Sequence, residues 1–119
     1  MADMTAHEDE ENVDWEAALG SVSGRRDLLT ELVEIFLAEC PALLADIAKA
    51  IETDAANELT VNAHRLKGSL RYFGNSVAAE RSAELEIIGR ERRLAEADAK
   101  FEEVKTALGR LLPRLRKGP

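Results

Sequence analysis

The segment around His64 is the part of the sequence best suited to chemistry. It runs from Ala63 to Ser69 and reads Ala-His-Arg-Leu-Lys-Gly-Ser. At about 100° per residue on a helix, Lys67 and Gly68 lie within about 60° of His64, with the apolar residues on the opposite side. An imidazole can act as a nucleophile, and an ammonium one turn away can pair with an anion that the ring carries. We therefore expect a solvent-facing histidine with a cation beside it.

Two further features favour a functional role for His64 over the alternative that it is a solvent-exposed histidine without a function. Gly68 falls in the middle of a predicted helix, where glycine costs about 0.8 to 1 kcal/mol relative to alanine. Its missing side chain would leave room beside His64 for another protein. On the next predicted helix, Glu86 and Arg90 share one stripe with two alanines. A carboxylate there could hold one ring nitrogen of His64 and leave the other free to attack.

Other chemistries lack the residues that they need. Lys67, Gly68 and Ser69 have the letters of a phosphate loop in the wrong order, and no dinucleotide-binding or nucleophile-elbow motif occurs, so ATP binding by this chain is not expected. Cys40 has only two histidines as further soft ligands, which excludes a structural zinc site on ligand count. We expect no metal ion and no cofactor on this chain.

The composition is that of a single acidic domain. The chain has 119 residues, of which 45% are hydrophobic and 33% charged, enough for one core. Its net charge of −7 argues against nucleic-acid binding. No apolar stretch approaches the roughly 20 residues of a membrane span, and the first residues lack the pattern of a secretory signal. A single cysteine permits no internal disulfide, which is typical of a reduced compartment. From these observations together we expect a cytoplasmic protein without membrane contact.

Apolar residues recur three and four apart in four long segments, which is the spacing of amphipathic helices. We expect these helices at residues 28–51, 54–73, 75 or 76 to 88, and 101–115. Pro41 should produce a kink or a restart within the first helix. Asp54 should cap the second, which stops at Gly74. A shorter helix should begin after Asp14, and no segment alternates as a strand does.

The predicted fold class is therefore all-α. Four helices with short connections pack most simply as an antiparallel up-down-up-down bundle, with the short N-terminal helix capping one end. We expect the bundle to occupy residues 13–117 and to close its core within one chain, which predicts a monomer. Residues 1–12 hold five acidic side chains and little that can be buried, so we expect a disordered acidic tail there.

The residues near His64 form a pattern that can be compared with known families. The residues of this pattern are Ala63, His64, Leu66, Lys67, Gly68, Ser69, Phe73 and Gly74. Their spacing resembles the signature of the histidine-containing phosphotransfer (HPt) domains of two-component phosphorelays. The resemblance implies that His64 is phosphorylated at Nε2, that Lys67 stabilises the phosphoryl oxygens and that Gly68 admits the partner. Glu86 matches the position at which the family places Glu or Gln against Nδ1.

The resemblance also implies partners and a surface that contacts them. The partner-contact residues would be Arg65, Gly68, Arg71, Tyr72 and Arg90. Arg71 and Tyr72 stand where the family more often has small or polar residues, which bears on the choice of partner. The expected partners are receiver domains of response regulators and, in addition, a hybrid histidine kinase. Mg²⁺ would be held by the receiver.

The implied function is that of a phosphocarrier between two receiver domains, and two alternatives stay open. The phosphorylatable domain of a chemotaxis-type kinase resembles the same motif but takes its phosphoryl group from the ATP of a kinase. A non-catalytic helical adaptor, in which His64 is incidental, belongs to a different class. The dimerising domain of a sensor kinase fits less well, because there an acidic residue typically follows the histidine, whereas Arg65 follows here.

Overall fold

The computed structural model describes residues 12–119, so the expected acidic tail lies outside the described residues except for its last position. The described part is helical and contains no strand, which confirms the all-α prediction. Its elements are α2 (Trp15–Ser21), α3 (Arg26–Glu52), α4 (Ala56–Arg71), α5 (Val77–Arg90), the short 3₁₀ helix η1 (Leu94–Glu96) and α6 (Ala97–Lys117).

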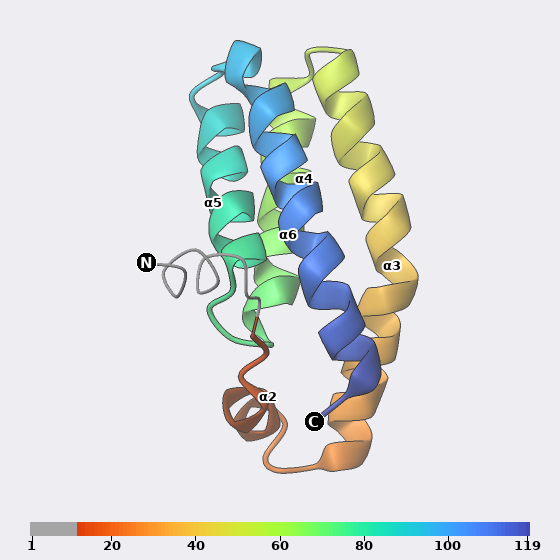
Figure 1. Cartoon of the computed structure of the whole chain (residues 1–119). Helices are drawn as coiled ribbons and strands as arrows, with labels where there is room; N and C mark the ends of the chain where they lie inside the picture. The colour runs from red at the N-terminus through yellow and green to blue at the C-terminus, as the bar shows by residue number, and fades with distance from the viewer. Residues whose placement is uncertain (1–11) are drawn as a thin grey trace.

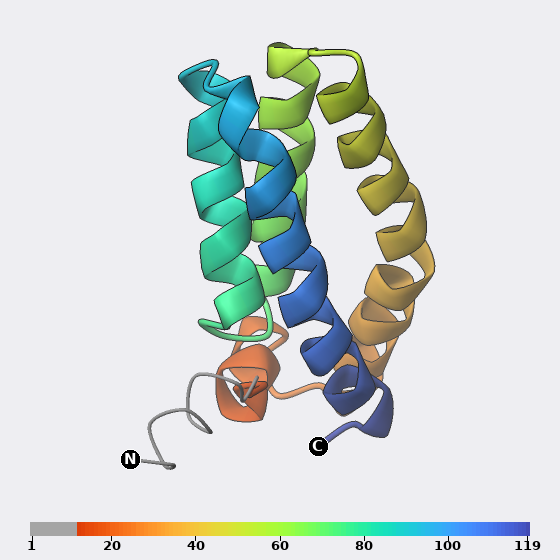
Figure 2. The same ribbon diagram turned by 45° about the horizontal axis from the view of Figure 1, so that its top comes forward.

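The four long helices α3 to α6 form the body of the molecule. Figures 1 and 2 show them running alternately up and down, with α2 across the lower end. Successive helices are in contact and α6 also packs against α3, so α4 and α6 lie diagonally across the core. Apolar side chains of every long helix fill the interior, among them Phe36, Leu66, Leu85 and Leu111. This core holds α4 and α5 side by side, and these two helices carry the candidate site.

Of the two outcomes predicted for Pro41, a kink or a restart, the restart does not occur, because helix α3 passes through Pro41 without interruption. Pro41 lies on the exposed side of the helix, where water can bind the carbonyl group that loses its intrahelical partner. Figure 2 shows the helix bowed outward rather than broken. The buried residues before and after the proline therefore stay on one face.

The prediction that Asp54 caps α4 is also wrong. The N-cap is Ala55, and Asp54 has a φ of +52°. Asp54 instead ends α3 in a left-handed turn, in which the N–H group of Ala55 donates to the carbonyl oxygen of Ala50 at 2.8 Å. A short polar side chain tolerates this conformation, and here it stops one helix rather than starting the next.

Helix α2 is tied to the end of α4. The carboxylate of Asp14 caps α2, as predicted, by accepting a hydrogen bond from the N–H group of Ala17 at 2.9 Å. The N–H group of Asp14 donates to the carbonyl oxygen of Phe73 at 2.8 Å. Next to Phe73, Gly74 has a φ of +106°, and a Cβ there would lie 2.7 Å from that of Asp14. A glycine is therefore required at this turn, and α2 is held beside the exposed end of α4.

The close approach of α4 and α5 depends on a second glycine. A Cβ on Gly89 would lie 2.6 Å from Oγ1 of Thr60 and 3.0 Å from its backbone nitrogen. Any larger residue would push the two helices apart. Because Glu86 lies one turn before Gly89, the same close packing brings its carboxylate up to α4.

Candidate functional site

His64 lies on the outer face of α4. Its side chain is 64% exposed, whereas those of Ala63 and Leu66 beside it in the sequence are buried. The apolar stripe of α4 therefore faces the core and the imidazole faces solvent, as the helical spacing predicts. The ring is open to another protein from its outer side.

Glu86 of α5 holds the inner side of this ring. Its carboxylate is 5% exposed, and Oε2 lies 2.9 Å from Nδ1 of His64. Burial by itself raises the pKa of Glu86, but the hydrogen bonds from Lys67 and His64 and the charge of Lys67 outweigh it, so the pKa lies below its ordinary value. An ionised carboxylate can only accept, so Nδ1 carries a hydrogen. Nε2 is the ring nitrogen that Glu86 leaves unheld.

Two cations share the carboxylate of Glu86 with the histidine. Nζ of Lys67 donates to Oε1 at 2.5 Å, and Nη2 of Arg90 donates to Oε2 at 2.6 Å. Lys67 is only 16% exposed, whereas Arg90 approaches from the solvent side. The sequence placed Arg90 among the partner contacts and missed this ion pair. Its spacing of four residues from Glu86 on one helix is the signal that indicates the pair.

The resulting cluster carries an excess of positive charge. One carboxylate, that of Glu86, meets two permanent cations and the imidazole of His64. An ammonium has three N–H donors, of which the contact of Lys67 with Glu86 uses one. The arrangement can therefore orient an imidazole nucleophile and stabilise an anion that arrives beside it.

Gly68 follows His64 by one turn on the same exposed face. A Cβ there would meet no atom within 4 Å, so packing does not require this glycine. It opens instead into a shallow hollow of about 230 Å³. The hollow is lined by Gly68, Arg71 and Tyr72 from the end of α4 and by Ala17 and Ser21 of α2. The candidate nucleophile therefore lies beside a surface depression into which another protein can project.

The exposed face around His64 is partly apolar. Val61 and Tyr72 are 57% and 52% exposed, and at about 100° per residue both lie within about 80° of His64 on the helix. Arg65 and Arg71 are exposed near them, so this face combines apolar and basic groups. The sequence indicated both arginines and Tyr72 but missed Val61, although a large apolar residue on the polar side of a helix is itself a signal.

Other kinds of site find little support in the described part of the chain. Within residues 12–119, no group of three or more His, Cys, Asp or Glu side chains is placed to hold a metal ion. Cys40 is buried, and burial raises the pKa of its thiol, which makes it a poor nucleophile. None of the helices between those limits is both long and apolar enough to cross a membrane.

A comparison with protein families covers most of the chain. Residues 31–114 match the family model described as the Hpt domain, a span that includes His64, Lys67, Gly68 and Glu86. The chain belongs to the Hpt domain family. The match confirms the resemblance seen in the sequence. The geometry of the site can therefore be compared with what histidine phosphotransfer requires.

The structural comparison agrees with this assignment. The crystal structure of histidine-containing phosphotransfer protein B (HptB) from Pseudomonas aeruginosa PAO1 is similar to this Hpt domain, with a TM-score of 0.75 and 22% sequence identity. The match covers 91% of this chain and 97% of that one. At this identity the likeness shows the fold alone. No curated protein sequence matches the chain.

The buried carboxylate leads to a prediction about stability. Glu86→Gln should lower the free energy of unfolding of the Hpt domain by about 1 to 3 kcal/mol near neutral pH, because the substitution removes the charge that Lys67, Arg90 and His64 share. Since the folded-state pKa of Glu86 is lowered, its stabilisation is present above the unfolded-state pKa of about 4.5 and is lost as the pH falls through the folded-state value. Urea unfolding of both proteins at about pH 7 and about pH 3.5 measures the difference.

Glu84→Gln provides a matched control on the same helix. Burial raises the pKa of Glu84, but Lys100 and Arg81 outweigh it and lower the pKa overall. The side chain of Glu84 is far more exposed than that of Glu86, so its substitution should cost less at neutral pH. The free energies of unfolding of the parent protein and of Glu86→Gln should differ at about pH 7 and converge in acid. If they are equal at about pH 7, or differ more in acid, Glu86 is not ionised as assigned.

Proposed function

We propose that this Hpt domain is a phosphocarrier in which His64 accepts a phosphoryl group from an aspartyl phosphate of one receiver domain and passes it to the aspartate of another response regulator. The observation that carries the proposal is the contact of Glu86 with Nδ1 of His64, because it leaves Nε2 on the exposed side. One chain closes its own core, which supports a monomer. We further propose that this monomer meets its receivers, and a hybrid histidine kinase, in the cytoplasm.

In the transfer step, the lone pair of Nε2 of His64 attacks the phosphorus of the aspartyl phosphate. The P–N bond forms as the P–O bond to the aspartate breaks, and the electrons of that bond leave with the carboxylate. Nδ1 keeps its hydrogen, so the phosphorylated ring is positively charged beside Glu86. The carboxylate stabilises this charge, and no proton has to leave the ring. The same steps in reverse move the group to the second receiver.

The charge on the phosphoryl oxygens is met from both proteins. The receiver would hold Mg²⁺, and Lys67 would supply the cation from this side. Lys67 can keep Glu86 on one N–H group and offer the others to the phosphoryl oxygens. Because Lys67 and Arg90 bind different oxygens of Glu86, the carboxylate is kept from rotating away from His64. Lys67 therefore has the role of stabilising the phosphoryl oxygens. Arg90 has the role of holding Glu86, and through it the imidazole ring, in position.

The exposed face of α4 supplies a docking surface of suitable chemistry. Val61 and Tyr72 offer apolar contacts, and the hollow at Gly68 admits a projecting group of the receiver. Arg65 and Arg71 favour a receiver with acidic groups at the rim of its phosphorylation site. This combination supports transfer between proteins more than it supports a static adaptor.

Incubation with receiver domains that carry labelled phosphate tests the proposed function. The label should move to this chain and should leave it again when an unphosphorylated second receiver is added. The bond should break in acid and persist in base, as expected of a phosphoramidate. Labelling that requires a chemotaxis-type kinase and ATP would instead support the phosphorylatable domain of such a kinase. Absence of label from every donor would support the adaptor.

A further inference from the structure

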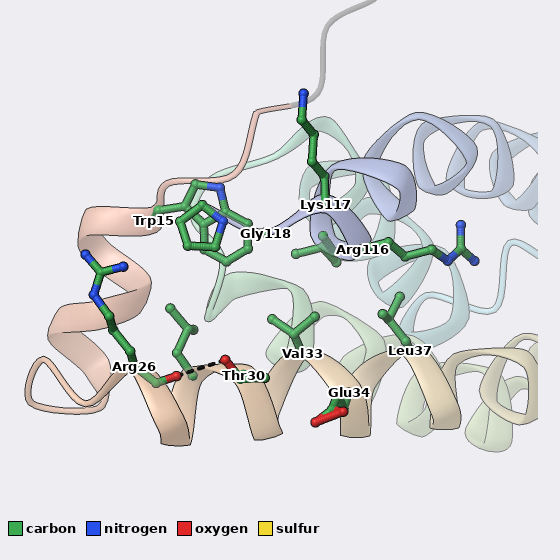
Figure 3. A pocket seen from close by; sticks show the side chains of 12 residues that line it. Trp15, Arg26, Thr30, Val33, Glu34, Leu37, Arg116, Lys117 and Gly118 are labelled. Carbon is green, nitrogen blue, oxygen red and sulfur yellow. Dashed lines mark hydrogen bonds between the residues drawn. The ribbon is translucent and has the colours of Figure 1, made fainter.

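A cleft lies between the start of α2, the first half of α3 and the end of α6 (Figure 3). Its volume is about 490 Å³, which is within the range of ligand-binding clefts. Trp15, Val33 and Leu37 give it apolar walls, and Trp15 and Leu37 are partly exposed there. None of the side chains that surround His64 lines the cleft, and Trp15 precedes the span that matches the Hpt family. Phosphotransfer therefore does not account for it.

Basic side chains surround the mouth of this cleft. Arg26 of α3 and Arg116 and Lys117 of α6 line it, with Glu34 as the acidic side chain among the lining residues. Figure 3 shows Arg26 beside Trp15 at one end, and Arg116 and Lys117 on the turn of α6 at the other. Within residues 12–119 these three cations take part in no ion pair. In a chain of net charge −7, such a mouth attracts a negatively charged occupant.

We propose that this cleft is the docking site of the acidic segment of the same chain, residues 1–11. The acidic side chains of the segment are Asp3, Glu8, Asp9, Glu10 and Glu11. The segment directly precedes the described residues, and Glu11 is only four residues from Trp15 in the wall of the cleft. An extended chain spans at most about 3.6 Å per residue, so Glu8 stays within about 14 Å of Asn12. The tether is therefore short, and the cleft beside Trp15 lies within reach of the acidic run.

The segment also has the chemistry that the cleft requires. Its carboxylates complement Arg26, Arg116 and Lys117 at the mouth, and Met4 offers an apolar side chain to the wall at Trp15. Exposed ion pairs are individually weak, but a short tether holds the segment at an effective concentration of about millimolar. A separate acidic peptide would lack that advantage. The covalent connection therefore favours the chain's own segment over an acidic partner.

The single tryptophan of the chain, Trp15, reports directly on occupancy. The full-length protein is compared with a variant in which Glu8, Asp9, Glu10 and Glu11 are all replaced by lysine, and quenching of Trp15 by neutral acrylamide is measured at low salt. The quenching constant of the variant should rise by about twofold if the tethered segment covers the ring for at least half of the time. At about 1 M salt, where the screening length is about 3 Å, the two proteins should become alike.

A charge swap separates docking from an effect of charge alone. Arg116→Glu together with Lys117→Glu should expose Trp15 as strongly as reversal of the acidic run does. Combining both sets of substitutions in one chain should restore the protection of Trp15, because the pairs re-form with opposite signs. If neither reversal changes the quenching, or if the combined variant stays exposed, the segment does not dock in this cleft.

Two controls separate this contact from a remote charge effect and from self-association. Lys49→Glu reverses a cation at the opposite end of α3 and should leave the quenching of Trp15 unchanged, and far-UV circular dichroism should be alike for all variants. Protection that increases with protein concentration would mean that a second copy of the chain covers the cleft, which would overturn the proposal. Protection that is independent of concentration and sensitive to salt supports the intramolecular contact.

Discussion

Replacement of His64 by glutamine is expected to leave the protein folded and unable to take up any label from a phosphorylated receiver. The substitution removes Nε2, the group to which the P–N bond is assigned, and puts no nucleophile in its place. An exposed side chain contributes little to the core, and a glutamine amide can still donate to Glu86, so stability should change by about 0.5 kcal/mol or less. Labelling followed by gel autoradiography, with circular dichroism of the same samples, measures both effects.

His7→Gln is the matched control, since His7 is the other histidine of the sequence. This variant should be labelled at the rate of the parent protein, and its label should show the same sensitivity to acid. Label that persists in His64→Gln would place the phosphoryl group on another residue and would remove the basis of the proposed function. Loss of label in both variants, with the parent protein labelled, would mean that His7 is needed as well and would contradict the assignment of the phosphoryl group to His64 alone.

The part of the site that lies on α4 could be predicted from the sequence because it depends on one helix. The spacing of the apolar residues decides which side of α4 is buried, and this fixes His64, Gly68 and Arg71 on the exposed side before any tertiary contact is known. The caps were predicted less well, since Asp54 has a side chain suited to starting a helix but occupies a turn that ends one. A local preference decides a helix end only where the backbone path allows it.

Features that join distant segments could be predicted only in part. The sequence placed Glu86 and Arg90 on one stripe, and the family resemblance directed Glu86 to the ring, but the convergence of Lys67 and Arg90 on one buried carboxylate depends on how closely α4 and α5 pack. That distance is set by Gly89 against Thr60, a contact that no helical periodicity reveals. The cleft at Trp15 is formed by three helices and was not predicted for the same reason.

Gly68→Gln is expected to fold well and to lose transfer from receivers selectively. Since a Cβ at Gly68 meets no atom within 4 Å, a residue with a better helix propensity should raise the stability of the free domain by up to about 1 kcal/mol. Gly89→Ala gives the contrast, because its Cβ would press on Thr60 and should cost about 1 to 3 kcal/mol. Thermal unfolding of the two variants distinguishes a glycine kept for access from one kept for packing.

The glutamine at position 68 would fill the hollow beside His64 and obstruct the receiver without touching the imidazole. Transfer from a phosphorylated receiver should therefore fall by about tenfold or more, which corresponds to about 1.4 kcal/mol of lost docking. Phosphorylation by phosphoramidate, a donor too small to need the hollow, should keep the rate of the parent protein.

Gly109→Gln is the matched control, since it fills open space at a mid-helix glycine of α6, diagonally across the core from α4. That variant should react normally with both donors. An equal loss with both donors in Gly68→Gln would show that the substitution disturbs the ring itself, and the access role of Gly68 would then be wrong even if His64 remained the phosphorylated residue.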